Sequence, residues 1–248
     1  MVRDTRLLMG MPVTVEIVDA GKDQLLDQVY DYFAAVDRRF STYRDDSEIS
    51  RINRGELAPE AASAEMREVL QLAERTRRET EGYFDIRRKD GTIDPSGIVK
   101  GWAIRNAAAI LSTAGVRNFY VDAGGDVQTG GRNAEGDAWV AGIRNPFNDQ
   151  EIIKAVKLAG HGIATSGSYV RGQHIYDPHD PNRSLDDVVS LTVIGPDVLE
   201  ADRFATAAFA MGDDGIYFIE SLPGCEGYQV NAAGRATFTT GWGAYVVQ

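Results

Sequence analysis

The chain of 248 residues has little that could crosslink it or hold a soft metal, since it contains one cysteine and three histidines. A lone Cys225 cannot form an internal disulfide, and it excludes a zinc site built on cysteines. Cys225 lies in a turn-like Leu-Pro-Gly-Cys stretch without a basic neighbour, so we expect it to be a structural thiol.

Long hydrophobic runs are also missing. No window approaches the ~20 apolar residues of a membrane span, so we expect no membrane span. The first six residues, MVRDTR, are polar and lack the apolar core of a signal peptide. We therefore expect a cytoplasmic location for the chain as given, with a trimmed export signal as the open alternative.

Basic residues are fewer than acidic residues. The chain has 26 Lys and Arg against 37 Asp and Glu, a formal net charge of -11, and its pI is about 4.8. An acidic surface repels phosphate backbones, so we expect no nucleic-acid partner. A small phosphorylated ligand remains compatible if backbone donors or a metal ion offset the charge locally.

Several familiar site motifs are absent as well. The chain has no Gly-x-Gly-x-x-Gly, no P-loop, no His-Glu-x-x-His and no Gly-x-Ser-x-Gly. What remains is a globular composition, with 43% hydrophobic and 25% charged residues. It is sufficient for one large domain or two small ones.

Hydrophobic periodicity predicts strands interrupted by helices without strict alternation. Helical spacing covers residues 25–36, 64–79, 103–114 and 199–211, with a short helical turn at 47–53. Strand-like stretches cover residues 13–17, 118–122, 139–143, 152–158 and 188–194. Residues 82–101 read as loop and turn. This order predicts a mixed α+β fold in one compact unit, with a division into two lobes left open.

Residues 94–101, Asp-Pro-Ser-Gly-Ile-Val-Lys-Gly, come directly before the alanine-rich helix. A turn that leads into a helix N-terminus offers free backbone N–H groups to a phosphate, and Lys100 could add a charge. An ordinary turn and helix cap is the alternative.

Asp202 and Thr206 are four residues apart, so on a helix they point the same way. A carboxylate and a hydroxyl on one face, with a nearby carbonyl, could hold a hard cation such as Mg²⁺. The alternative is an Asp paired with Arg203 and a Thr bonded to its own backbone.

Two of the three histidines, His174 and His179, lie in one short stretch. His174 suits the role of a general base, with a structural histidine as the alternative. Glycines cluster at residues 122–126 and 164–167, where they permit close approach of a ligand or form bulges. Tyr43, Tyr83 and Phe84 could stack on a planar ring or anchor the core.

In this order the stretches resemble the ApbE family, the FAD:protein FMN transferases. The resemblance extends from Met9 to about Gly212. It comprises Met9-Gly10, residues 40–43 and 47–53, Gly82-Tyr83-Phe84-Asp85, residues 94–101, the double glycine of 122–126, and residues 164–167, 174–178 and 202–206. Each stretch is weak alone, and their shared order carries the identification. It implies an ApbE-like, T-fold-like architecture and one domain over residues 1–248.

The resemblance implies a Mg²⁺-dependent enzyme with FAD as its substrate. The FMN moiety passes to a Thr or Ser hydroxyl of a target flavoprotein, and AMP is released. By position, the carbonyl of Gly97 with Asp202 and Thr206 resembles the metal set, and His174 with Asp202 the catalytic pair. The residues that resemble the FAD contacts are Met9, Tyr43, Tyr83, Phe84, Asp85, Asp94, Lys100 and Ile175.

The chain departs from the family pattern at two relevant positions. Met11 follows Met9-Gly10 where the family usually has Thr, and Ala205 stands where some members carry a second acid beside the metal-binding Thr. Fewer charges imply a weaker metal site. Two alternatives stay open: a pyrophosphatase that converts FAD into FMN and AMP, and a non-catalytic FAD-binding protein.

Overall fold

The central element is an antiparallel sheet of eight strands in the order β1-β2-β3-β4-β7-β8-β9-β10. The protein is described by a computed structural model over residues 1–167, 176–180 and 183–247. The strands are β1 Val2–Leu8, β2 Met11–Ile17, β3 Phe119–Ala123, β4 Asp126–Gly130, β7 Gly162–Gly167, β8 Val188–Gly195, β9 Glu226–Asn231 and β10 Ala236–Phe238. A separate hairpin pairs β5 Trp139–Asn145 with β6 Asn148–Leu158.

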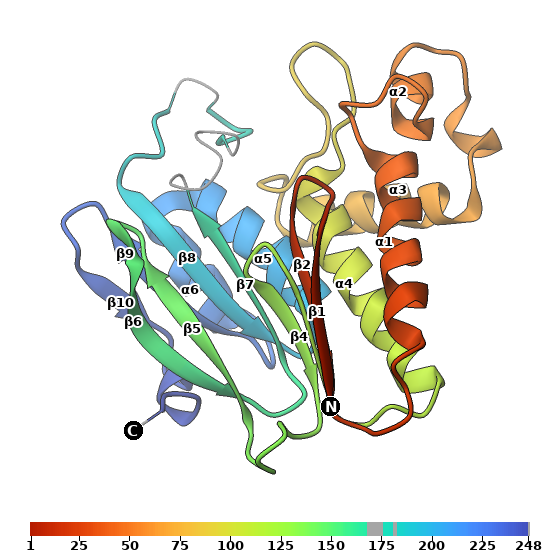
Figure 1. Cartoon of the computed structure of the whole chain (residues 1–248). Helices are drawn as coiled ribbons and strands as arrows, with labels where there is room; N and C mark the ends of the chain where they lie inside the picture. Colours follow the sequence, from red (N-terminus) through yellow and green to blue (C-terminus); the bar gives the residue numbers. More distant parts are fainter. Residues whose placement is uncertain (168–175, 181–182, 248) are drawn as a thin grey trace.

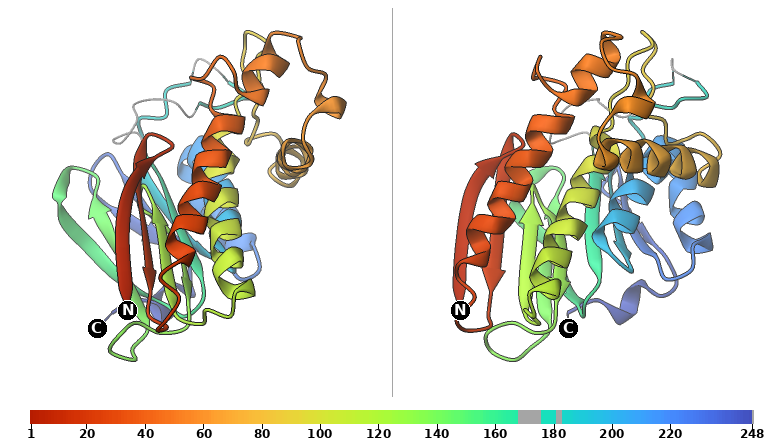
Figure 2. Two further views of the ribbon diagram at one scale, coloured as in Figure 1. Left: turned by 45° about the vertical axis from the view of Figure 1, so that its right-hand side comes forward. Right: turned by 90° about the vertical axis from the view of Figure 1, so that its right-hand side faces the viewer.

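Helices cover one face of the large sheet and the β5–β6 hairpin covers the other, giving three layers (Figures 1 and 2). The helices are α1 Leu25–Phe40, α2 Glu48–Asn53, α3 Ala64–Glu79, α4 Ser96–Thr113, α5 Val198–Met211 and α6 Gly215–Ser221. Short 3₁₀ turns occupy Pro59–Ala61, Gly212–Asp214 and Trp242–Ala244. The layers form one compact unit, so the predicted mixed α+β class is confirmed.

Three apolar clusters join these layers. The largest packs α1, α3 and α4 against β2 and β3. A second packs α5 against β7 and β8, and a third fills the space between the hairpin and the sheet. Because α5 contributes side chains to both the first and the second cluster and packs on α4, it connects the two helical cores.

The helix ends follow local capping chemistry. The hydroxyl of Ser47 accepts the N–H of Ser50, and the hydroxyl of Ser63 accepts the N–H of Met66. Asp197 caps α5 by accepting the N–H of Glu200 at 3.0 Å. The helices predicted at residues 64–79 and 199–211 are therefore confirmed, the second starting one residue earlier.

The stretch predicted as loop, residues 82–101, is wrong in its second half, because α4 begins at Ser96. Asp94, just before the N-cap residue Pro95, accepts the N–H of Ser96 at 3.1 Å and thereby fixes the turn that leads into the helix. Gly97 and Gly101 lower the intrinsic helix propensity, and the packing of α4 on α5 compensates for them.

Strand β1 has no counterpart in the prediction, since its exposed side chains give no apolar alternation. Strands β4, β9 and β10 and helix α6 were also unpredicted. No helix in the described part of the chain combines the length and apolar character needed to cross a bilayer.

Candidate functional site

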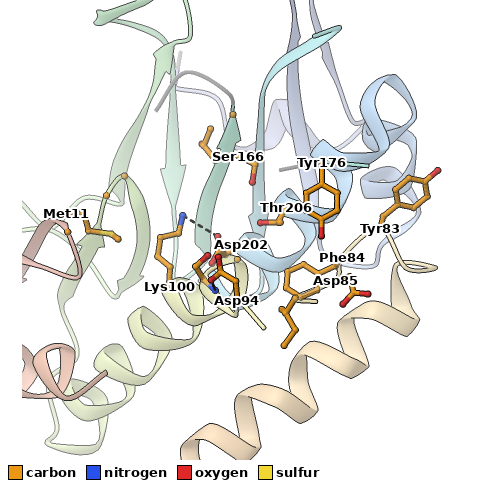
Figure 3. A pocket seen from close by; sticks show the side chains of 18 of the residues that line it. Met11, Tyr83, Phe84, Asp85, Asp94, Lys100, Ser166, Tyr176, Asp202 and Thr206 are labelled. Carbon is orange, nitrogen blue, oxygen red and sulfur yellow. Dashed lines mark hydrogen bonds and ion pairs between the residues drawn. The ribbon is translucent and has the colours of Figure 1, made fainter. Parts of the chain in front are cut away.

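A cavity of about 740 Å³ opens where the loops of the sheet meet the N-terminal half of α4. Figure 3 shows Met11 on one side, Tyr83, Phe84 and Tyr176 on the other, and Lys100 between them. Its lining comes from segments far apart in the sequence: Gly10 to Pro12, Thr14, Tyr83 to Ile86, Arg88, Asp94, Ser96, Gly97, Lys100, Asp122, Gly124, Gly125, Arg144, Thr165 to Gly167, Tyr176, Pro178, Asp202 and Thr206.

Two tight hairpin loops form one wall. Met9 and Gly10 connect β1 to β2, and Gly124 and Gly125 connect β3 to β4; all four have positive φ, between 52° and 97°. This is the conformation of type I′ turns, which glycine tolerates best. The two loops are neighbours because β2 pairs with β3, and the N–H of Gly124 donates to the carbonyl of Pro12 at 3.1 Å.

Gly124 and Gly125 therefore form the turn between β3 and β4. The N–H of Gly125 donates to Asp122 Oδ1 at 2.9 Å, so both glycine N–H groups are used within the fold. Residues 124 and 125 form a tight turn between regularly paired strands, so the bulge interpretation is wrong for them; the close approach of a ligand stays a prediction.

The opposite wall is the loop before α4. Phe84 is buried, with 3% of its surface exposed, and its N–H donates to the Thr80 hydroxyl at 3.1 Å. The Tyr83 ring meets the ring of His179 edge-on at 4.5 Å. Together with Tyr176, whose hydroxyl donates to the carbonyl of Arg87, these rings give the cavity an aromatic end.

The floor is the crossing of α4 and α5. The N–H of Gly101 donates to Asp202 Oδ2 at 2.8 Å. A Cβ on Gly101 would lie 2.7 Å from Asp202 Cβ and 3.0 Å from Leu199 Cα, which is closer than real side chains approach. Glycine at position 101 therefore lets the two helices approach closely enough for the backbone of α4 to hold the carboxylate of α5.

Lys100 lies between two buried carboxylates. Its Nζ pairs with Asp126 Oδ2 and lies 3.3 Å from Asp202 Oδ1. Asp126 is fixed in turn, because its Oδ1 accepts the N–H of Thr165 at 3.0 Å. Burial raises the pKa of Asp202 above its usual range, and the positive charge of Lys100 opposes that rise.

Asp202 and Thr206 project from one face of α5 into the cavity, as their spacing predicts, and Gly97 faces them from α4. A Cβ on Gly97 would lie 3.5 Å from Thr206 Cγ2, so the two backbones are close. In an ideal α-helix the N–H of Gly101 would donate to the carbonyl of Gly97. In this protein the N–H of Gly101 donates to Asp202 Oδ2.

A carboxylate, a hydroxyl and a backbone carbonyl are hard oxygen donors, which suit Mg²⁺. Within the described ranges, no three His, Cys, Asp or Glu side chains gather to hold a metal ion. Gly97, Asp202 and Thr206 fit a Mg²⁺ ion that completes its coordination with water and substrate oxygens, as this cation commonly does.

Asp85 and Asp94 line the cavity but already have partners. Asp85 accepts the N–H of Arg87 at 2.9 Å. Asp94 accepts the N–H of Ser96 at the start of α4, and its other oxygen pairs with Arg88. Both carboxylates therefore shape the loop around the cavity, whichever ligand contacts they also make.

The remaining candidates lie elsewhere. Tyr43 is 97% exposed and is not among the residues that line the cavity. Met9 packs half-buried against the largest core cluster, while its neighbours Gly10 and Met11 line the cavity. His174 and Ile175 lie outside the described residues, so their roles stay predictions.

The cavity also contains polar residues that were not selected as site residues from the sequence: Arg88, Asp122, Arg144, Thr165, Ser166 and Tyr176. Asp126 stands just behind it, paired with Lys100. The stretches around Asp122, Asp126 and Ser166 were conspicuous for their glycines, which was a usable signal. Arg144 lies in an ordinary strand-like stretch and had none.

Comparison with known proteins gives a consistent set of matches. The model of a family described as the ApbE family matches residues 9–92 and 87–229. A protein of Vibrio cholerae named FAD:protein FMN transferase is 29% identical over 249 residues, covering 77% of this chain and 72% of its own. One of the same name from Salmonella typhimurium is 27% identical over 262 residues, covering 81% and 75%.

Solved structures share the fold. The flavin transferase ApbE from Vibrio cholerae superimposes with a TM-score of 0.84 at 24% identity, covering 98% of both chains. The ApbE protein from Thermotoga maritima reaches 0.85 at 22% identity, covering 100% of this chain and 99% of its own.

Proposed function

This chain belongs to the ApbE family, and from that premise we propose that it is a Mg²⁺-dependent FAD:protein FMN transferase. It transfers the FMN moiety of FAD to a Thr or Ser hydroxyl of a target flavoprotein and releases AMP. We further propose that residues 1–248 form one transferase domain. The observation that carries the proposal is one cavity in which Lys100 of α4 lies together with Asp202 and Thr206 of α5.

The N-terminal end of α4 suits a diphosphate. Ser96 and Gly97 line the cavity at the start of an 18-residue helix, whose dipole favours negative charge at this end. Lys100 follows one turn later, and its ammonium group is held by Asp126 and Asp202. The N-terminus of α4 and Lys100 would bind and orient the phosphate oxygens of FAD in a protein that is otherwise acidic.

Gly97, Asp202 and Thr206 would hold Mg²⁺. The bound ion would supply charge neutralisation of the diphosphate and polarise the phosphorus under attack. The Gly101 N–H keeps Asp202 Oδ2 in place, so the carboxylate is already oriented.

The aromatic end, formed by Tyr83, Phe84 and Tyr176, would take a planar ring of the dinucleotide by stacking. The acceptor oxygen forms a bond to the phosphorus on the FMN side. The bond from that phosphorus to the oxygen bridging to AMP breaks, and AMP leaves with the electron pair. His174 is the proposed base for the hydroxyl proton.

The test is incubation of the protein with FAD, Mg²⁺ and a candidate target flavoprotein. A fluorescent flavin–protein band on a denaturing gel, with stoichiometric AMP, supports transfer. FMN and AMP without a fluorescent band would identify a pyrophosphatase instead. FAD recovered intact after long incubation would identify a binding protein.

A further inference from the structure

Three cationic side chains line the described part of the cavity: Arg88, Lys100 and Arg144. Lys100 is paired with Asp126 and Asp202, and Arg88 with Asp94. Among the described residues, the guanidinium of Arg144 has no hydrogen bond or ion pair. It is therefore the lining cation whose donors are not already used within the fold.

Arg144 lines the cavity next to an irregularity in the pairing of β5 with β6. Along this strand Trp139, Ala141 and Ile143 are buried against the large sheet and the residues between them are exposed. The pairing of β5 with β6 shifts register on both sides of Arg144. The extra residues lie on β6, and Arg144 continues the buried–exposed alternation of β5. Arg144 therefore lines the cavity from a different layer than Lys100 does.

The nearby carboxylate of Asp122 forms no ion pair with the guanidinium of Arg144. Its oxygens accept the N–H of Gly125 at 2.9 Å and the hydroxyl of Tyr120 at 3.3 Å. Burial raises the pKa of Asp122, and the charge of Arg144 only partly opposes that rise. The two residues interact through space, without a direct ion pair.

The described lining of the cavity is not positively charged overall, so its cations must balance wall carboxylates as well as any ligand. Four carboxylates line the cavity, Asp85, Asp94, Asp122 and Asp202, against the three cations. Four negative and three positive charges leave a formal charge of -1, and without Arg144 it would be -2. A diphosphate would add further negative charge, so each unpaired cation in the wall matters to its binding.

We propose that Arg144, which lines the cavity from the β5–β6 hairpin, binds phosphate oxygens of the FAD diphosphate. This inference rests on the proposed function. The planar guanidinium offers two parallel donors to a phosphate, which an ammonium group cannot match.

The experiment compares Arg144→Gln and Arg144→Lys with the unmodified protein. Lys157→Gln is the matched control, because Lys157 is exposed on the same hairpin and does not line the cavity. Dissociation constants for FAD and for ADP are measured by calorimetry at fixed Mg²⁺ and salt. Thermal melting checks that each variant folds, which the exposure of Arg144 favours.

We expect Arg144→Gln to weaken both FAD and ADP binding by about tenfold, the loss of one charge-assisted contact. Arg144→Lys should recover part of the loss, and Lys157→Gln should bind like the unmodified protein. Unchanged ADP binding in Arg144→Gln would overturn the inference, whether or not FAD binding weakens. A rise confined to the KM of the acceptor protein would also overturn it. An unmodified protein that binds neither nucleotide would instead refute the proposed function.

Discussion

Replacing Gly101 with Ala adds one methyl group at the crossing of α4 and α5, and it tests whether that crossing holds the site together. The new Cβ would lie 2.7 Å from Asp202 Cβ, 2.9 Å from Asp202 Oδ2 and 3.0 Å from Leu199 Cα. Carbon atoms in contact prefer about 3.5–4.0 Å. The helices must therefore separate, or Asp202 must move.

The cost can be estimated from these contacts. Overpacking of a core costs about 1–3 kcal/mol, and weakening the buried bond from the Gly101 N–H to Asp202 adds about 1 kcal/mol. Alanine returns about 1 kcal/mol through helix propensity. We expect a net loss of about 1–3 kcal/mol in the free energy of unfolding, which lowers Tm by about 2–10 °C in a chain of this length.

Gly97→Ala is the matched control on the same helix. Its Cβ would meet Phe84 at 3.4 Å and Thr206 at 3.5 Å, which are ordinary contacts. Differential scanning calorimetry should therefore show Gly97→Ala melting at or slightly above the unmodified protein, because alanine also raises the helix propensity there. Gly101→Ala should melt well below both. If Gly101→Ala melts at or above the temperature of Gly97→Ala, the close crossing of α4 and α5 is wrong.

Three further predictions concern the proposed metal and base. Asp202→Asn should weaken Mg²⁺ binding by at least about tenfold, since it removes the only formal charge of the proposed ligand set; calorimetry that finds unchanged affinity would remove Asp202 from that set. Because a ligating carboxylate must be ionised and burial raises the pKa of Asp202, Mg²⁺ affinity should fall as the pH drops through that raised pKa and level off above it; a titration series with no pH dependence would contradict this. His174→Ala should lower kcat while leaving the FAD dissociation constant nearly unchanged; weaker FAD binding with normal turnover at saturation would identify a binding residue.

Local chemistry explains which parts of the fold were predictable. Helix α3 has a serine cap and an apolar face, and both signals are contained in adjacent residues. The i, i+4 spacing of Asp202 and Thr206 likewise placed both side chains in one cavity. Strand β1 was missed because an edge strand with an exposed face needs no apolar alternation. The start of α4 was misplaced because its glycines are stabilised by packing on α5, which lies about a hundred residues away along the chain.

The mixed class, most helices, the family resemblance and the acidic charge could be read from residue order alone, because each depends on residue type and short-range spacing. Three features of the site depend on packing between distant segments: Lys100 pairs with both Asp126 and Asp202, two hairpin loops form one wall, and Arg144 enters the cavity from a separate hairpin. Those contacts join strands and helices from different layers, and their geometry is set by how the layers pack.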